Sequence, residues 1–309
     1  MNGALRTALI FPGQGLQHVG MGASLTSASA AAADVFACAD AVLGLSLSTY
    51  CFSGPEDTLR QTAIAQPAIL THSIAAFRAA ESSAPLEWQV AVGHSLGEWS
   101  ALVAAGALTF EDALRLVHLR GQLMQAAVAD GVGAMVAILG LDGDAVAALC
   151  EVAAQGEVVS IATYNGAQNL VVSGHVAAVA RLSALAIAGG AQRVQALPVS
   201  APFHCSLMAP AAAGLASALA DIEIRPPRRA VVSTVSGAAE DDPERWRLLL
   251  VEQLVAPVRF SQAIGLLAAQ GVTVGVALGP ATSLKGMVRR IEATLKVRVV
   301  ESGEHLAMV

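Results

Sequence analysis

Short apolar runs alternate with longer stretches of helical periodicity along the chain, and this alternation predicts an α/β protein. Apolar runs predict strands at 8–11, 90–92, 230–235, 272–278 and 297–300. Helical periodicity predicts helices at 29–43, 68–80, 98–107, 208–220 and 241–254. Further helices are expected from the turn at 53–57 and after Thr109, and a basic helix is expected to end at Ile291. Gln66-Pro67 interrupts the pattern before 68–80, because proline has no N–H and is disfavoured inside a helix. Gln66 is therefore either a cap of that helix or a residue with another role.

The middle of the chain has a different order of elements. Strands are expected at 133–139, 158–163, 169–173 and 192–199, and helices at 143–154 and 176–188. The order βαββαβ is that of the ferredoxin-like split unit. We therefore expect an inserted ferredoxin-like subdomain at 130–199 and a larger domain formed by 1–129 and 200–309.

Composition then narrows the class of protein. Hydrophobic residues make up 55% of the chain and charged residues 14%, which allows a large core and argues against disorder. An apolar run of about 18 residues is lacking, and the run at 8–11 is too short for a signal peptide, so we expect a cytoplasmic protein without a membrane span. The net charge of −6 argues against nucleic-acid binding. The four cysteines show no zinc or redox spacing, so we expect no metal site.

The candidate chemistry is concentrated at Gly93-His94-Ser95-Leu96-Gly97, which fits the pattern G-x-S-x-G. An expected strand precedes it and an expected helix follows it, which is the context of a nucleophile elbow. The two glycines would let the tight turn form without a clash of a Cβ atom. Main-chain N–H groups after Ser95 would then point toward a developing oxyanion. The alternative is a Gly-Ser turn that caps a helix, and the pentapeptide alone does not decide between the two.

Arg120 and His204 are two further candidates. Arg120 lies between Val117 and Met124 on the apolar stripe of its helix, and its guanidinium cannot lose its charge there. It therefore needs an anionic partner, either a core carboxylate in an internal salt bridge or the carboxylate of a substrate. His204 lies in the loop that leaves the expected subdomain, where a histidine is either structural or transfers protons.

The motifs together resemble those of the malonyl-CoA:acyl carrier protein transacylase family, which includes the acyltransferase domains of polyketide synthases. They cover nearly the whole chain in the right order, and they are Phe-Pro-Gly-Gln-Gly at 11–15, Gln66-Pro67, Gly-His-Ser-Leu-Gly-Glu at 93–98, Leu-Arg-Gly at 119–121, Pro-Phe-His at 202–204, Gln253, Pro-Val-Arg-Phe at 257–260 and Gly279-Pro280. Leu16 and Ala281 depart from the family, which often has Ser and Gly at these places. The resemblance implies an α/β-hydrolase-like core with an inserted ferredoxin-like subdomain.

The resemblance also implies a catalytic role for five residues. Ser95 would be the acylated nucleophile, and His204 would be its general base and later the acid. The main-chain amides of Gln14 and Leu96 would form the oxyanion hole. The main-chain carbonyl of Gln253 would orient His204, at the place where other serine enzymes have a carboxylate.

Three further residues would bind the substrate. Arg120 would hold the carboxylate of the malonyl group, Gln66 would be a pocket residue, and Phe203 would crowd the malonyl α-carbon and disfavour methylmalonyl. The substrate implied is malonyl-CoA, the partner is a phosphopantetheinylated acyl carrier protein, and no cofactor is permanently bound. We expect a monomer. Carrier proteins of this kind are acidic, so two basic clusters are candidate docking surfaces: Lys285, Arg289 and Arg290, and Arg225, Arg228 and Arg229.

Other functions stay open at this stage. A serine esterase or thioesterase also uses G-x-S-x-G, but it predicts an acidic third member of a triad and no role for Arg120. An acyltransferase could instead use another acyl-CoA in polyketide synthesis, or load a malonate decarboxylase. A non-catalytic module that only docks a carrier protein would lack Ser95, His204 or Arg120, and all three are present.

Overall fold

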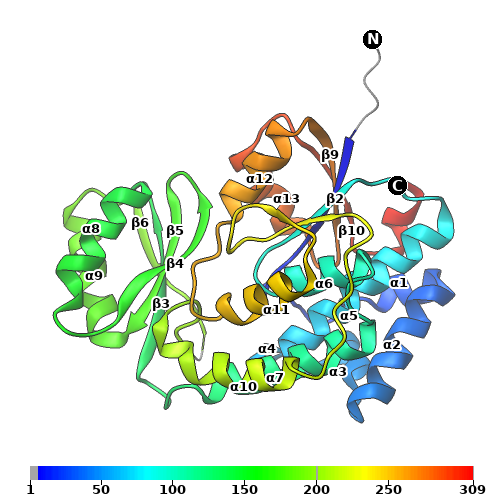
Figure 1. The fold of residues 1–309 in the computed structure, drawn as a ribbon, viewed down its shortest axis with the longest axis horizontal. Coiled ribbons are helices and arrows are strands. Elements are labelled where there is room, and N and C mark those ends of the chain that lie inside the picture. Colours follow the sequence, from blue (N-terminus) through cyan, green and yellow to red (C-terminus); the bar gives the residue numbers. More distant parts are fainter. Residues whose placement is uncertain (1–5, 200, 309) are drawn as a thin grey trace.

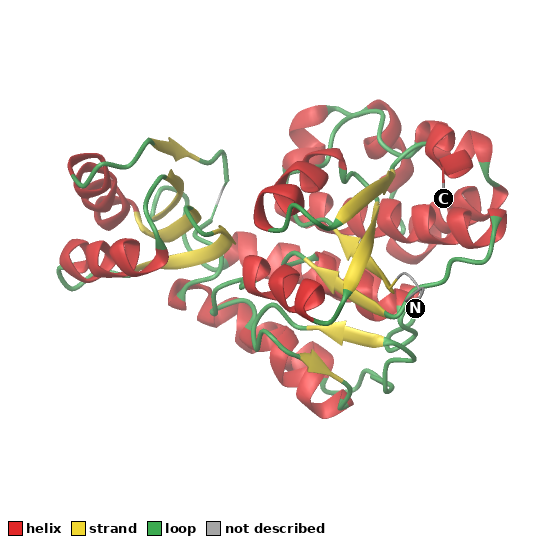
Figure 2. Ribbon diagram, turned by 90° about the horizontal axis from the view of Figure 1, so that it is seen from above, coloured by secondary structure: helices red, strands yellow, loops and turns green. Residues whose placement is uncertain are grey.

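The computed structural model describes residues 6–199 and 201–308, and it contains two sheets with their own helices (Figure 1 and Figure 2). The larger sheet has six strands in the order β10-β9-β1-β2-β7-β8. They are β1 (Arg6–Phe11), β2 (Val90–Gly93), β7 (Ala230–Val232), β8 (Ala239–Glu240), β9 (Val272–Leu278) and β10 (Lys296–Val300). The first five strands in that order run parallel, and β8 pairs antiparallel with β7. Residue 200, the expected domain boundary, lies outside the described residues.

Helices cover both faces of the larger sheet, as buried parallel strands require. Leu9 and Phe11 of β1 pack in one buried cluster, whereas Ala8 and Ile10 pack in another on the opposite face. The helices of this part are α1 (Ala23–Ala28), α2 (Ala30–Leu43), α3 (Leu47–Ser53), α4 (Glu56–Arg60), α5 (Thr62–Ser83), α6 (Gly97–Ala104), α7 (Phe110–Ala126), α10 (Ala209–Leu219), α11 (Pro243–Glu252), α12 (Phe260–Ala269) and α13 (Thr282–Ile291), with 3-10 turns η1 (Ser206–Met208) and η2 (Gly303–Met308). None of the helices in the described part of the chain combines the length and apolarity needed to cross a membrane.

The smaller sheet has four antiparallel strands in the order β4-β5-β3-β6. Its elements are β3 (Gly133–Leu139), α8 (Gly143–Ala154), β4 (Val159–Gly166), β5 (Asn169–His175), α9 (Val176–Ala188) and β6 (Arg193–Ala196). The expected order βαββαβ is therefore present. Figure 1 shows α8 and α9 on the side of this sheet that faces away from the larger sheet. A bridge between Thr163 of β4 and Val258 joins the smaller sheet to the segment between α11 and α12.

The expectation for Gln66 and Pro67 as a break before a helix is wrong, because both residues lie inside α5. Pro67 removes the N–H that would bond the carbonyl of Ala63, one turn earlier. Nδ1 of His118, on α7, lies 2.8 Å from that carbonyl oxygen and donates to it instead. The helix therefore continues through the proline with the carbonyl of Ala63 paired. Helices α1, α3 and α12 are also additions to the elements expected from the sequence.

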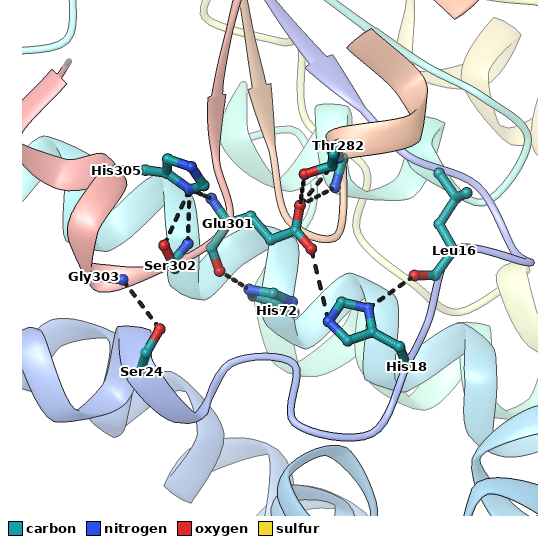
Figure 3. A network of polar contacts seen from close by, with 10 residues as sticks. Leu16, His18, Ser24, His72, Thr282, Glu301, Ser302, Gly303 and His305 are labelled. Carbon is teal, nitrogen blue, oxygen red and sulfur yellow. Dashed lines mark hydrogen bonds and ion pairs between the residues drawn. The ribbon is translucent and has the colours of Figure 1, made fainter. Parts of the chain in front are cut away.

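A polar network around Glu301, just after β10, holds the start of α13 (Figure 3). One carboxylate oxygen of Glu301 accepts hydrogen bonds from the N–H of Ala281 at 3.2 Å, the N–H of Thr282 at 3.0 Å and the Thr282 hydroxyl at 2.6 Å. The other lies 3.8 Å from Nε2 of His18, in the loop after β1. The main-chain oxygen of Glu301 accepts from Nε2 of His72 at 2.9 Å. A carboxylate at a helix N-terminus is stabilising, so this network fixes the first turn of α13.

Candidate active site

The turn between β2 and α6 carries Ser95 in a strained conformation. Ser95 has a φ of 50°, in the left-handed region that few residues other than glycine adopt. A Cβ on Gly93 would lie 1.9 Å from the main-chain carbon of Gly97, and a Cβ on Gly97 would lie 2.4 Å from the carbonyl oxygen of Phe11. Both positions therefore need glycine. The strand, tight turn and helix of a nucleophile elbow are all present.

Ser95 and His204 meet between the two sheets. The Ser95 hydroxyl lies 2.9 Å from Nε2 of His204, and Nδ1 of His204 lies 2.8 Å from the main-chain oxygen of Gln253. The Nδ1 proton is therefore donated to this carbonyl, which leaves Nε2 free to accept a proton from Ser95. The group that orients His204 is thus a main-chain carbonyl, and not the carboxylate of an esterase triad.

Both members of this pair are shielded from water. Ser95 is 8% exposed and His204 is 5% exposed. Burial, followed by the positive charge of Arg120, lowers the pKa of His204 to about 3. The imidazole is therefore neutral at pH 7 and can act as a base.

Arg120 lies beside this pair and has neutral partners. It is 1% exposed, and it donates to Oε1 of Gln66 at 2.6 Å, Oε1 of Gln253 at 2.9 Å and the Ser95 hydroxyl at 3.3 Å. None of the ion pairs found within 6–199 and 201–308 involves Arg120. The alternative of a direct internal salt bridge is therefore wrong. Burial lowers the pKa of Arg120 to about 10, so the guanidinium keeps its charge at neutral pH.

Glu98, in the first turn of α6, is a buried carboxylate that the sequence did not single out. Gln253 donates to it at 2.6 Å, and the N–H and the hydroxyl of Thr234 also donate to it, the hydroxyl at 2.6 Å. Burial raises the pKa of Glu98 to about 7, and these hydrogen bonds and Arg120 act in the opposite direction. A carboxylate on a buried, largely apolar helix must have polar partners. The position of Glu98 among apolar residues could therefore have indicated from the sequence that it takes part in a buried polar network.

A cavity of about 410 Å³ opens onto these side chains. Of the residues predicted from the sequence, Gln14, Ser95, Arg120, Phe203 and His204 line it. Leu96, Gln66 and Gln253 are fully buried and are not part of its wall. Gln66, which we predicted to be a pocket residue, lies behind Arg120 and supports its guanidinium. Leu284 and Met287 of α13 also line the cavity.

The main-chain N–H groups of Gln14 and Leu96 come from two separate segments near the nucleophile. Gln14 lies in the loop after β1 and lines the same cavity as Ser95, and Leu96 follows Ser95 at the start of α6. Within the described residues neither N–H donates to another main-chain group. Neither N–H therefore has a competing main-chain acceptor in this part of the structure.

Comparison with known proteins agrees with this geometry. Residues 8–305 match the acyl transferase domain family. The malonyl CoA-acyl carrier protein transacylase of Escherichia coli K12 is 42% identical over 300 residues, which is 97% of each chain. The solved structure of the malonyl CoA-acyl carrier protein transacylase from Coxiella burnetii superposes with a TM-score of 0.97 at 40% identity, over 98% of this chain and 96% of that one.

A third comparison is with a complex. A malonyl-transacylase solved together with a type II polyketide synthase acyl-carrier protein is 40% identical, with a TM-score of 0.96 over 98% of both chains. Identity at this level over nearly the whole length, together with the Ser95–His204 pair beside a buried arginine, shows the family. The chain belongs to the acyl transferase domain family and, within it, to the malonyl CoA-acyl carrier protein transacylases.

Proposed function

We propose that this protein transfers the malonyl group of malonyl-CoA to the phosphopantetheine thiol of an acyl carrier protein through an acyl-serine intermediate. The observation that carries the proposal is the position of Arg120. A guanidinium that has no carboxylate partner among the described residues lies 3.3 Å from the hydroxyl of the nucleophile, at the wall of the cavity. An acyl group that ends in a carboxylate would supply the missing partner.

In the first step Ser95 is acylated. Nε2 of His204 takes the hydroxyl proton while the Ser95 oxygen bonds to the thioester carbon of malonyl-CoA. The carbonyl oxygen becomes an oxyanion, which the N–H groups of Gln14 and Leu96 stabilise by about 3 kcal/mol each. The carbon–sulfur bond then breaks, and His204 returns the proton to the sulfur of coenzyme A.

The second step reverses the first with a different thiol. His204 takes the proton of the phosphopantetheine thiol, whose sulfur attacks the carbonyl carbon of the malonyl ester. The carbon–oxygen bond breaks, and His204 returns the proton to Ser95. Because Ser95 and His204 are almost fully buried, the acyl-enzyme is shielded from water between the two steps.

Two side chains are expected to select the acyl group. Arg120 would remain buried without a partner when an acetyl group is bound, which is unfavourable. Phe203 lies at the cavity wall beside His204, so an added α-methyl group would collide with it, a misfit worth roughly 10- to 200-fold in kcat/KM. We therefore expect wild-type protein to prefer malonyl over methylmalonyl by about tenfold or more.

A competition between malonyl-CoA, methylmalonyl-CoA and acetyl-CoA, read as intact masses of the acyl-enzyme, tests this. Phe203→Ser should narrow the gap between malonyl and methylmalonyl, and Arg120→Ala should raise the proportion of acetyl. Met287→Leu, a volume-conserving change at another residue of the cavity wall, is the control and should keep the wild-type order. A wild-type preference for acetyl would show that the carboxylate site is misplaced.

The two basic clusters are expected to differ in carrier binding. Lys285, Arg289 and Arg290 are exposed on α13, the helix that also contributes to the wall of the active-site cavity. Arg225 and Arg228 instead line a different cavity of about 570 Å³ that shares no residue with it.

Reversal of charge on α13, by K285E together with R289E, should raise KM for the carrier protein and leave KM for malonyl-CoA unchanged. The matched pair R225E with R228E should have little effect on either value. Steady-state kinetics with each substrate varied in turn separates the two clusters. If the two pairs changed KM for the carrier protein equally, α13 would not be the docking surface.

We also propose that residues 130–199 form a ferredoxin-like subdomain inserted between the two parts of the larger domain. The contact of His94 Nε2 with Oδ1 of Asn165, at 2.8 Å, supports a role of β4 in bracing the elbow. The cytoplasmic location and the monomeric state stay predictions. Cell fractionation and analytical ultracentrifugation test them.

A further inference from the structure

Glu98 is a buried ionisable group that the two transfer steps do not use. It is 0% exposed, and the ion pairs within the described ranges do not include it. One of its oxygens accepts from the N–H and the hydroxyl of Thr234, and the other accepts from Nε2 of Gln253 at 2.6 Å. The N–H of Thr234 and Nε2 of Gln253 can only donate, and the Thr234 hydroxyl is placed to donate as well, so these contacts favour the ionised carboxylate.

The carboxamide of Gln253 has one consistent orientation between its neighbours. Its nitrogen donates to Glu98 and, at 3.1 Å, to the main-chain oxygen of Ser95, while its oxygen accepts from Arg120 at 2.9 Å. A flipped amide would place its nitrogen against the guanidinium and its oxygen against two acceptors. Glu98, with the main-chain oxygen of Ser95, therefore determines which end of Gln253 faces Arg120, and Glu98 makes the shorter contact.

We propose that Glu98 is a positioning residue that acts through the Gln253 carboxamide to orient the Arg120 guanidinium, and thereby sets the selectivity of the enzyme for acyl groups that carry a carboxylate. This inference rests on the proposed malonyl transfer. A carboxylate in direct contact with Arg120 would compete with the carboxylate of the substrate. The intervening amide orients the guanidinium while its charge stays available.

The same arrangement connects selectivity with the catalytic base. The main-chain oxygen of Gln253 accepts the Nδ1 proton of His204, so one residue contacts Arg120 by its side chain and His204 by its main chain. The side chain is what Glu98 anchors. Loss of Glu98 should therefore weaken the binding of the substrate carboxylate more than it slows proton transfer.

Glu98→Gln is the direct test, because it keeps the size of the side chain. If the new amide oxygen accepts from Thr234, the new nitrogen meets Nε2 of Gln253, and the contact that anchors the Gln253 side chain beside Arg120 is lost. The ratio of kcat/KM for malonyl-CoA to that for acetyl-CoA should then fall by about tenfold or more, mainly through KM for malonyl-CoA. If Glu98→Gln does not fold, Glu98→Asp, which keeps the charge but is shorter, should lower the ratio in the same direction.

Two controls separate positioning from a merely structural role. Leu182→Ala in α9, within the core of the smaller sheet, should lower the melting temperature and leave the malonyl-to-acetyl ratio unchanged. In a Gln253→Leu background, Glu98→Gln should not lower the ratio further, because the connection to Arg120 is already lost.

A Glu98→Gln protein with a lower melting temperature but the wild-type ratio would overturn the inference. The inference would also be overturned if Glu98→Gln lowered the malonyl-to-acetyl ratio by the same factor in the wild-type and the Gln253→Leu backgrounds. The proposed function is tested separately, since it fails only if wild-type protein does not transfer malonyl at all.

Discussion

Ser95→Ala is expected to abolish the malonyl-enzyme and to lower the rate of malonyl transfer by about four to six orders of magnitude. The hydroxyl at the elbow is the group that His204 contacts at 2.9 Å and that Arg120 contacts at 3.3 Å. Without it the cavity still binds malonyl-CoA, but no oxygen is placed to attack the thioester. Intact-mass measurement after mixing with malonyl-CoA reads the outcome directly.

The fold of the Ser95→Ala protein should be unaffected, because alanine replaces serine in the same strained turn and the two glycines that permit the turn remain. Cys38 is partly exposed and could be acylated by the thioester without catalysis. Cys38→Ala is therefore the matched control and should keep the full adduct. An adduct that persists in Ser95→Ala and maps to the elbow peptide would show that another residue is the nucleophile.

The strands could be predicted from the sequence because they are buried on both faces. In β1, Ala8 and Ile10 face one cluster while Leu9 and Phe11 face the other, so the strand is a continuous apolar run. The start of α5 could not be predicted. The carbonyl of Ala63 that Pro67 leaves unpaired is bonded by His118, which comes from a helix 55 residues further along the chain. The pattern of residues around Pro67 gives no sign of a partner so far away in the chain, so the sequence predicts a break where the helix continues.

In the candidate site, too, the features set by neighbouring residues could be predicted, and those set by distant residues could not. Ser95 could be predicted as a nucleophile because the elbow is local, with its glycines and its flanking elements contiguous in sequence. The partners of Arg120 could not be predicted from residue types, since Gln66 and Gln253 are neutral and far away in the chain. The anionic partner expected for Arg120 is not among its direct contacts. The carboxylate of Glu98 is present, but the amide of Gln253 separates it from the guanidinium.

His204→Ala is expected to slow acylation by roughly two to four orders of magnitude. The variant keeps Ser95 and the N–H groups that would stabilise the oxyanion, but no group remains to take the hydroxyl proton. His175, at the end of β5, serves as a control because it does not line the cavity, and His175→Ala should acylate at the wild-type rate. Stopped-flow or quenched-flow measurement of the acyl-enzyme gives both rates. Acylation of His204→Ala within tenfold of wild type would exclude His204 as the base.

The protonation of His204 offers an independent measurement. Burial and the charge of Arg120 lower its pKa to about 3, far below the ordinary value, so the ring should stay neutral from pH 8 down to pH 5. The NMR signal of the ring, assigned by its absence in His204→Ala, should therefore not shift over this range, and a midpoint inside it would contradict the assignment. A bound malonyl carboxylate would offset the positive charge of Arg120. The loss of this repulsion would raise the pKa of His204 and so make it a stronger base. An acetyl group brings no such charge, so the carboxylate that Arg120 selects also makes proton transfer from Ser95 more favourable.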